Sequence, residues 1–393
     1  TEILLTEDCK IIMKIVHLCL SCFYIDNYSY QENMLPKYHV KMGHDVTVIA
    51  SLFPFNKDGK PCLLKSASEH FDKDGYKVIR LAYKSPNKLY RTLRKYEGFY
   101  ETLENEKPDV IFSHGVSMAD NSVLRKYLKK HTNVKLYADN HADYINSATN
   151  FLSKNVLHKI IWKHYVKKIE PYIIKCFGVT PMRCRFLSEM YHINDNIIDF
   201  LPMGVDDESI PNNRYDVRKN IREQHNIDDD DFLIFTGGKI DKRKNIHVLV
   251  DTIKQLNNPK LHLVICGVLS PEMVYLRNNF NKNIHYLGWC NSEQVMNNML
   301  ASDIACFPGT HSTLWEQAVG VGLPCILKLW NEMTHMDING NCLFIKGDDT
   351  YELKDTINRM MNKDFYLQQK EKASNAAQFF LYSDIAKKAI ELK

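Results

Sequence analysis

The residues best suited to chemistry lie in two loops of the second half of the chain. The first loop, 237–245, carries Lys239 and Lys244 behind a pair of glycines, which allow a ligand to approach the backbone. The second segment, 309–324, carries Glu316. Two ammonium groups would neutralise a diphosphate, and a carboxylate would accept hydrogen bonds from sugar hydroxyls. These residue types predict a site for a diphosphate-bearing ligand with free hydroxyls.

The segment around Glu316 supports a second interpretation. Residues 312–321 have a helical pattern, and the residues at its start, His311, Ser312, Thr313 and Leu314, would offer backbone N–H groups to an anion. Thr313 and Glu316 also have the spacing of a capping box, in which the glutamate satisfies the backbone of its own helix. The segment alone leaves both uses of Glu316 open.

A nucleotide ligand also needs a surface for its base. Gly288-Trp289 follows an apolar run and could frame a flat ring, and Gly238 precedes Lys239. No Gly-x-x-x-x-Gly-Lys-Ser/Thr motif occurs, which argues against a nucleotide hydrolase of that class. The acidic run 228–231 precedes an apolar run, where a solvated turn is expected and a metal site is not.

The elements that would position these residues alternate between apolar runs and helical patterns. This alternation predicts an α/β fold with doubly wound parallel sheets, whose ligands bind beyond the carboxyl ends of the strands. The strands are expected at 14–20, 46–50, 77–81, 108–112, 134–138, 175–180, 231–236, 261–267, 284–288, 304–307 and 324–327. The main helices are expected at 28–41, 87–106, 246–256, 271–279, 292–301, 312–321 and 382–392.

The pattern restarts after a polar tract, which predicts two domains facing each other across a cleft. Residues 13–205 form the first domain and 206–376 the second, and the helix within 377–393 packs back on the first. Residues 1–12 carry acids where a signal peptide carries bases, so we interpret them as an extension of unknown use.

Composition narrows the cellular setting. The net charge is only +4, which gives no reason to expect nucleic acid, and no apolar stretch reaches the ~20 residues needed to cross a bilayer. The eleven cysteines are odd in number and many lie in apolar runs, which favours a reducing, cytoplasmic location. The stretch 153–175 predicts a long basic helix, which could lie on the inner face of a membrane or pack on the sheet with a solvated basic face.

Together these motifs resemble those of retaining glycosyltransferases with two Rossmann-like domains, the GT-B architecture, and specifically family 4 (group 1), which includes bacterial surface-polysaccharide transferases. The 238–245 loop is similar to that family's Gly-Arg…Lys-Gly loop, with Lys239 in the arginine position. Residues 316–324 are similar to its Glu-Ala-Met-Ala-x-Gly-x-Pro block, and 43–48 to its Gly-His-x-Val-x-Val ending. His141 stands where the family has an active-site histidine.

The resemblance implies transfer of a sugar from a nucleotide-diphosphate sugar to a hydroxyl of a glycan or lipid-linked acceptor, with retained configuration. The first domain would hold the acceptor and the second the donor, a UDP-sugar first and a GDP-sugar second. It also implies that no metal and no bound cofactor take part. Lys239, Lys244 and Glu316 would then act on the donor, and His141 would position the reacting sugar. A buried structural histidine is the alternative interpretation of His141.

One departure from the family pattern leaves other functions open. The family has a further glutamate eight residues before the second one, and that position is Pro308 here. His311 or Ser312 would then take part of its role. Two alternatives therefore stand beside the transferase: a GT-B-fold nucleotide-sugar epimerase and a non-catalytic nucleotide-sugar-binding protein.

Overall fold

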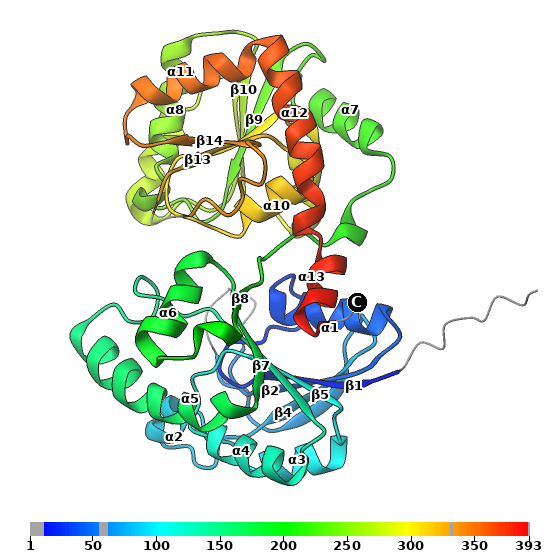
Figure 1. Ribbon diagram of the computed structural model, residues 1–393. Helices are drawn as coiled ribbons and strands as arrows, with labels where there is room; N and C mark the ends of the chain where they lie inside the picture. Colours follow the sequence, from blue (N-terminus) through cyan, green and yellow to red (C-terminus); the bar gives the residue numbers. More distant parts are fainter. Residues whose placement is uncertain (1–11, 55–61, 331–332, 392–393) are drawn as a thin grey trace, which may run out of the picture. The chain divides into compact units, whose positions relative to one another are not determined.

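The computed structural model describes residues 12–54, 62–330 and 333–391 (Figure 1). Of the predicted N-terminal extension, only Ile12 lies within this part of the chain. The described residues form two compact units: those of 1–201 together with those from 386 onward, and those of 202–385. The division lies close to the junction expected near residue 205, whereas the roles assigned to the two domains remain predictions.

The first unit is built on an eight-stranded sheet with the order β3-β4-β2-β1-β5-β6-β7-β8. Every neighbouring pair is parallel except β3 and β4, which run antiparallel. The strands are β1 (Lys14–Cys19), β2 (Asp45–Ser51), β3 (Ser68–Phe71), β4 (Lys77–Leu81), β5 (Val110–His114), β6 (Lys135–Asn140), β7 (Ile173–Gly178) and β8 (Ile198–Phe200).

Helices connect these strands in the right order for a doubly wound sheet. The single helix expected at 87–106 is wrong, because Arg94 and Gly98 adopt left-handed backbone conformations that end one helix and begin another. The helices are α1 (Gln31–Lys41), α2 (Lys88–Leu93), α3 (Phe99–Glu106), α4 (Asn121–Lys130), α5 (Lys163–Ile169) and α6 (Pro181–Tyr191), with short 3-10 turns η2 (Glu170–Tyr172) and η3 (Asp195–Ile197).

The basic segment expected as one helix over 153–175 has a different form. It begins with a π-helix, η1 (Leu152–Trp162), continues as α5 and ends at Tyr172, and residues 173–175 belong to strand β7. The prediction is therefore wrong in its last three residues. Side chains four residues apart lie on the same side of a π-helix, as they do in an α-helix.

The second unit contains a six-stranded, fully parallel sheet with the order β11-β10-β9-β12-β13-β14. Its strands are β9 (Phe232–Gly237), β10 (Leu261–Cys266), β11 (Ile284–Gly288), β12 (Ile304–Phe307), β13 (Cys325–Lys328) and β14 (Cys342–Ile345). Its helices are α7 (Arg214–Gln224), α8 (Ile246–Leu256), α9 (Ser292–Ala301), α10 (Leu314–Gly320), α11 (Thr350–Met361) and α12 (Lys363–Ala377), with 3-10 segments η4 (Asp207–Ser209), η5 (Lys242–Lys244), η6 (Pro271–Asn279) and η7 (Gln378–Phe380).

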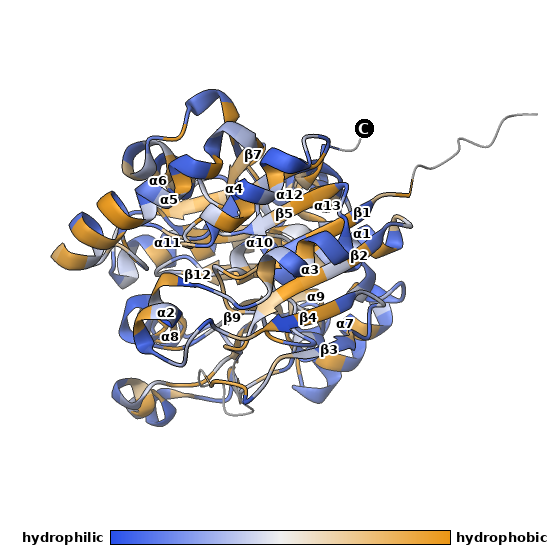
Figure 2. Ribbon diagram, turned by 90° about the horizontal axis from the view of Figure 1, so that it is seen from below, coloured by the Kyte–Doolittle hydropathy of each residue, from blue (hydrophilic) through white to orange (hydrophobic). Residues whose placement is uncertain are grey.

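Burial on both faces explains why the strands were predictable. All six residues of β10 and all four of β12 are buried, and Figure 2 shows that many helices carry both hydrophobic and hydrophilic residues. Every strand expected from the sequence exists, within two residues at either end. The two domains are therefore Rossmann-like, as predicted.

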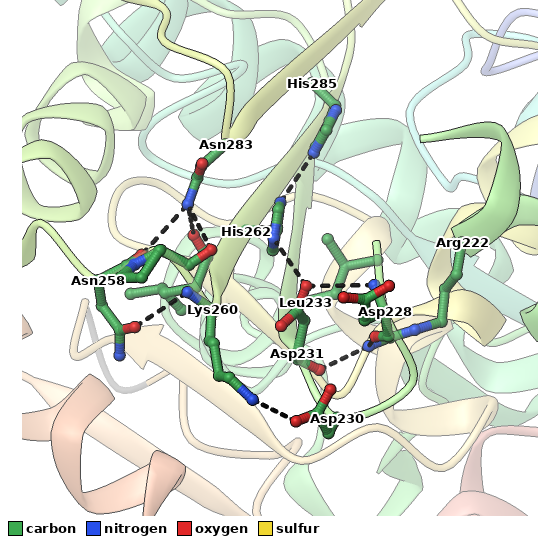
Figure 3. Close-up of polar contacts among 12 residues, drawn as sticks. Arg222, Asp228, Asp230, Asp231, Leu233, Asn258, Lys260, His262, Asn283 and His285 are labelled. Carbon is green, nitrogen blue, oxygen red and sulfur yellow. Dashed lines mark hydrogen bonds and ion pairs between the residues drawn. The ribbon is translucent and has the colours of Figure 1, made fainter. Parts of the chain in front are cut away.

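The acidic run 228–231 closes the amino-terminal edge of the second sheet (Figure 3). Asp231 accepts a hydrogen bond from the backbone of Asp228 and lies 3.2 Å from His262 Nε2, while Asp230 pairs with Lys260. The buried Arg222 donates to the carbonyls of Asp228 and Asp231. This turn is structural and lies at the sheet edge opposite to the predicted site.

The end of the chain returns to the first unit. Helix α13 (Tyr382–Ala389) begins in the second unit, and its residues from Ala386 onward contact the first. His39 Nε2 lies 2.8 Å from the carbonyl oxygen of Ala386, and Lys388 donates to the carbonyl of Phe200 at 2.6 Å. Tyr137 donates to the Glu391 carboxylate at 3.3 Å.

Candidate functional site

The loops predicted to form a site in the second unit converge at the carboxyl edge of its sheet. The loop after β12 packs directly on the loop after β9, because a Cβ on Gly309 would lie 2.3 Å from the backbone of Arg243 and Lys244. Thr310 N donates to the Arg243 carbonyl at 3.0 Å. Gly267, which follows β10, leaves equally little room, since a Cβ there would lie 1.8 Å from the Gly238 oxygen. Glycine is thus required where these loops meet.

Lys244 joins the two loops. Its Nζ donates to the carbonyls of Thr310 and His311, at 2.7 and 2.8 Å. Burial lowers the pKa of Lys244 to about 8, and the nearby Asp241 only partly offsets burial. Lys244 therefore holds the loop that leads to Glu316 and keeps one ammonium hydrogen for another acceptor.

Lys239 and Trp289 stand apart from these contacts. Lys239 is exposed, and its side chain forms no hydrogen bond or ion pair with any other residue that the structure describes. Trp289 follows β11, and 71% of its surface is exposed. Both lie beyond strand ends at the same edge as Lys244, with strands β9 and β11 separated by β10. Among the described residues, neither forms a hydrogen bond or ion pair with Glu316, whose partners are His311 and His335.

Glu316 is held by two histidines. It is fully buried in helix α10, and its Oε1 lies 2.7 Å from His311 Nε2 and 3.0 Å from His335 Nε2. Thr313, at the N-cap, makes no side-chain capping bond. The capping-box interpretation is therefore wrong, because the Glu316 side chain turns to the histidines and away from the helix end. The sequence pointed to His311 but not to His335, which lies in an irregular segment after β13.

The charge of this cluster and its polar atoms without hydrogen-bond partners suit a polyhydroxylated ligand. Burial raises the pKa of Glu316, but the charges and hydrogen bonds of His311 and His335 outweigh burial and hold this pKa well below its usual range. Among the described residues, Glu316 Oε2, Ser312 Oγ and Trp315 Nε1 are buried without a hydrogen-bond partner. Buried polar atoms are nearly always paired, so three such atoms within five residues indicate a place for a polar ligand.

The remaining predicted residues are structural neighbours of this cluster. Leu314 packs against the glycine pair, and its Cδ1 lies 3.7 Å from the place of a Cβ on Gly238. Gly238 itself has a φ of 108°, which only glycine adopts readily. Thr313 begins α10 in a helical conformation.

The first unit contains its own cavity, of about 900 Å³, at the carboxyl ends of its strands. His141 lines it, together with Gly115, Asn140 and the buried ends of Arg94 and Trp162. Such a volume fits a sugar residue with neighbouring groups. Sequence reasoning found His141 and missed the rest of this lining, because these residues come from four separate loops and helices.

His141 is paired with a buried acid. Its Nε2 lies 3.4 Å from Asp139 Oδ2, which is an ion-pair distance without good hydrogen-bond alignment, and a quarter of its side chain is exposed. Burial lowers the pKa of His141, but attraction to Asp139 outweighs burial and raises it above the ordinary value. Asp139 itself is fully buried, accepts from Gly115 N at 2.9 Å and lies 3.0 Å from His114 Nδ1.

Cations dominate the charged lining of this cavity. Lys88, Arg91 and Arg94 line it, and Glu32 is the acidic counterpart. Within the described residues, the side chains of Lys88 and Arg91 form no hydrogen bond or ion pair, whereas Arg94 stacks on Trp162 and donates to the carbonyl of Ser117. The cavity is therefore suited to a ligand that carries negative charge.

Two histidine–carboxylate groups have the spacing that could hold a metal ion: His114, Asp139 and His141, and His311, Glu316 and His335. An acidic group at 228, 230 and 231 has similar spacing. Hydrogen bonds and ion pairs within the two histidine groups account for their close contacts. We therefore identify none of these residues as a metal ligand.

The fold and the paired sites define a class of protein, the GT-B glycosyltransferases. A family model described as "Glycosyl transferases group 1" matches residues 217–378, and one described as "Glycosyltransferase Family 4" matches residues 35–209. These matches account for most of both units. The chain belongs to this family and is a glycosyltransferase, as its motifs predicted.

Solved structures agree on the fold. The chain is similar to a glycosyltransferase from Rickettsia africae, with a TM-score of 0.68 and 16% identity over 97% of both chains. It is also similar to Anabaena HepE, solved with UDP and glucose, with a TM-score of 0.65 and 14% identity over 96% of this chain and 98% of that one. It is similar as well to WaaG, a glycosyltransferase involved in lipopolysaccharide biosynthesis, with a TM-score of 0.62 and 14% identity over 96% of this chain and 99% of that one. A comparison with curated protein sequences gives no match.

Proposed function

We propose that the protein transfers a sugar, with retention of configuration, from a nucleotide-diphosphate sugar to a hydroxyl of a phosphate-bearing glycan or lipid-linked acceptor, in the making of a surface polysaccharide. The observation that carries the donor half is the buried Glu316 with an unpartnered Oε2, held beside the loop that Lys244 fixes. A UDP-sugar is the first choice of donor, because HepE, a protein of the same fold, was solved with UDP-glucose.

The donor would be held by charge and by hydroxyl contacts. Glu316 Oε2 accepts hydrogen bonds from the ribose diol, and Ser312 Oγ from a further hydroxyl or phosphate oxygen. Lys239 and the free hydrogen of Lys244 neutralise the diphosphate as the bond to the anomeric carbon breaks. Fixed cations beside a developing negative charge lower the barrier of such a step by a few kcal/mol each. Trp289 stacks on the base.

The acceptor would bind in the cavity of the first unit. His141 contacts the reacting sugar, and its charge is set by Asp139. Lys88 and Arg91, which have no acidic partner, bind an anionic group of the acceptor, for which phosphate is the first choice.

The π-helix supports a membrane-bound acceptor. Leu152, Val156 and Ile160 are 69, 40 and 62% exposed and, being four residues apart, form one apolar stripe beside Phe151, which is 75% exposed. Lys159 and Lys163 flank this stripe. Exposed apolar side chains with nearby lysines are typical of helices that lie on anionic membranes, so we assign η1 to contact with a membrane surface. The described residues contain no helix long and apolar enough to span a bilayer.

The test is a panel of UDP- and GDP-sugars incubated with the protein, with and without polyprenyl-diphosphate-linked sugars and matching sugars that lack phosphate. We expect release of nucleoside diphosphate that depends on the acceptor and is much faster with the phosphate-bearing one. Release without any acceptor would instead identify an epimerase or hydrolase. Tight donor binding without turnover on any acceptor would identify a binding protein.

A further inference from the structure

A line of buried histidines connects the end of the chain to the acid beside His141. His39 Nε2 lies 2.8 Å from the carbonyl oxygen of Ala386, and His39 Nδ1 lies 2.9 Å from His17 Nε2. His17 Nδ1 lies 3.0 Å from His114 Nε2, and His114 Nδ1 lies 3.0 Å from Asp139 Oδ2. All three histidines and Asp139 are fully buried.

The hydrogen bonds along this line require more hydrogens than three neutral histidines supply. The line has four contacts at hydrogen-bond distance, and each needs one hydrogen. The Ala386 carbonyl and an ionised Asp139 can only accept, so both ends of the line lack a hydrogen of their own. A neutral imidazole carries one N–H, and three neutral histidines therefore supply one hydrogen too few.

The carbonyl of Ala386 also fixes the direction of the bonds. His39 must donate from Nε2, which leaves its Nδ1 as an acceptor for the N–H of His17. His17 Nδ1 then accepts from His114 Nε2. With only three hydrogens, the lone pair of His114 Nδ1 would face the Asp139 carboxylate at 3.0 Å, which is repulsive in a dry interior.

One additional proton removes this conflict and makes the group electrically neutral. A buried negative charge without a partner is costly, whereas an imidazolium beside a carboxylate is a compensated pair. Burial, and then the charges of His39 and His114, lower the pKa of His17. Burial also lowers the pKa of His39, to about 4, and the hydrogen bond to the Ala386 carbonyl only partly offsets it. The proton therefore resides at the Asp139 end of the line.

We propose that His39, His17 and His114 form a proton-holding chain in which His114 carries one additional proton, and that this fixed charge sets the ionisation of the Asp139–His141 pair. His114 would donate one hydrogen bond from Nε2 to His17 Nδ1 and another from Nδ1 to Asp139 Oδ2. The chain residues are positioning residues, since His141, which lines the cavity, is the one exposed to a ligand. This role rests on the proposed function of the cavity.

The charged surroundings limit how His141 responds. Besides Asp139, His141 faces the carboxylate of Glu32 and the guanidinium of Arg183, and Arg183 is itself paired with Asp143 at 3.2 Å. His44 lies beside His39, with ring centroids 6.5 Å apart, and is outside the chain. A cation at His114 opposes protonation of His141, because it screens the negative charge of Asp139. Loss of that cation should raise the pKa of His141.

The decisive experiment is nitrogen NMR of the full-length protein labelled with ¹⁵N-histidine, with signals assigned from single substitutions. In the wild-type protein we expect His39 to carry its hydrogen on Nε2 alone and His114 to carry hydrogens on both nitrogens. In His17→Leu, His114 no longer donates a hydrogen bond to His17 and needs only the hydrogen that it donates to Asp139. His114 therefore becomes neutral, and the pKa of His141 rises by about half a unit or more.

Two variants separate this role from simple packing. His39→Gln keeps a donor for Ala386 and an acceptor for His17, so the pKa of His141 should stay at its wild-type value. His44→Gln removes a neighbouring histidine outside the chain and should also leave it unchanged. The proposal is overturned by a neutral His114 in the wild-type protein, by a bound metal ion at Asp139, or by an unchanged His141 pKa in folded His17→Leu. If His17→Leu fails to fold, the wild-type spectrum alone decides.

These spectra need no donor or acceptor. A protein that turns over none of the sugars tested can still show the additional proton, and an active transferase can still lack it. Failure of the proton chain and failure of the proposed function are therefore distinguishable.

Discussion

Lys239 and Lys244 lie in one loop, yet their side chains have different environments. Lys244 is half-buried and donates two hydrogen bonds to backbone carbonyls of the next loop, whereas the Lys239 side chain is exposed and pairs with no other described residue. A ligand would be the first partner of Lys239. Charge and loop structure can therefore be tested separately in this loop.

We predict that Lys244→Ala lowers turnover at least ~tenfold and also lowers the melting temperature, because a transition-state charge and a loop contact are lost together. Lys239→Ala should lower turnover with an unchanged melting temperature. Lys242→Ala, an exposed lysine of the same loop, serves as the control for both measurements. Near-normal turnover of both alanine variants at 239 and 244 would count strongly against the site.

The pKa of Lys244, about 8, predicts a pH dependence of ligand binding. As pH rises above 8, the free protein loses the ammonium that binds diphosphate, so the dissociation constant for UDP should increase, by up to about tenfold per pH unit. Stability of the free protein should change in the opposite sense. The folded pKa lies below the unfolded value of 10.5, so the ammonium destabilises the folded state below pH 8, and stability rises from pH 8 to 10.5.

Calorimetric titration with UDP between pH 7 and 10 checks this dependence. Lys244→Ala should bind weakly and with a much flatter pH profile. A wild-type profile that is flat over this range would show that Lys244 does not contribute charge to the ligand.

Sequence reasoning reached single residues only where a motif or a strand end marked them. Glu316 and Lys244 follow buried strands in recognisable patterns. His335 has no such marker. The histidine chain depends on side chains that are 22 and 97 residues apart in sequence, on helix α1 and strands β1 and β5, and that meet only in the folded protein. Periodicity carries no information about such meetings.

At the scale of elements, the loop after β12 depends on a close backbone approach. A Cβ on Gly309 would lie 2.3 Å from the Lys244 carbonyl carbon, so the backbone and not a flexible side chain would have to move. We predict that Gly309→Ala destabilises the protein by roughly 1–3 kcal/mol and weakens UDP binding as the Glu316 loop shifts. Gly347→Ala is a suitable control, since the atoms nearest to its Cβ are ends of flexible carboxylates. Urea unfolding of both variants measures the difference.

The π-helix predicts a membrane interaction that depends on apolar side chains. Leu152→Ser with Ile160→Ser should reduce flotation with phosphatidylglycerol vesicles at least several-fold, because exposed apolar area drives insertion into the interface. Removing the charges of Lys159 and Lys163 should weaken binding to anionic vesicles and not to neutral ones. Lys167 is a poorer target, because it pairs with Glu170 and donates to the His192 carbonyl. Unchanged flotation of the serine variant would leave η1 as an ordinary surface helix.

Elements were predictable in proportion to their burial. The central parallel strands are buried on both faces and give continuous apolar runs, so their positions were found. The parallel edge strands β8 and β14 are short and only partly buried, and the sequence analysis missed them. The antiparallel edge strand β3, Ser-Glu-His-Phe, is largely exposed and gives no apolar signal. Helix α2 ends because Arg94 adopts a left-handed backbone conformation. An arginine does not predict this conformation from sequence, as a glycine would.

At the scale of the whole molecule, the chain has two α/β units, each with a candidate site of its own. The first unit offers a cavity with His141 and unpaired cations, and the second offers the buried oxygens of Glu316 and Ser312 beside the loop that Lys244 holds. The fold and the family followed from the alternation of elements and a few motifs. The identity of donor and acceptor did not, because it depends on the detailed lining of the two sites.

The central claim is that the second unit binds a sugar nucleotide through Glu316. Calorimetric titration of a UDP-sugar into the wild-type protein and Glu316→Gln, with Lys354→Ala in helix α11 as a control, tests it most directly. The account predicts at least about tenfold weaker binding for Glu316→Gln in a correctly folded protein, and no change for the control. The claim would be contradicted if Glu316→Gln bound UDP- and GDP-sugars as tightly as the wild-type protein does. It would also be contradicted if the wild-type protein bound neither kind of sugar nucleotide.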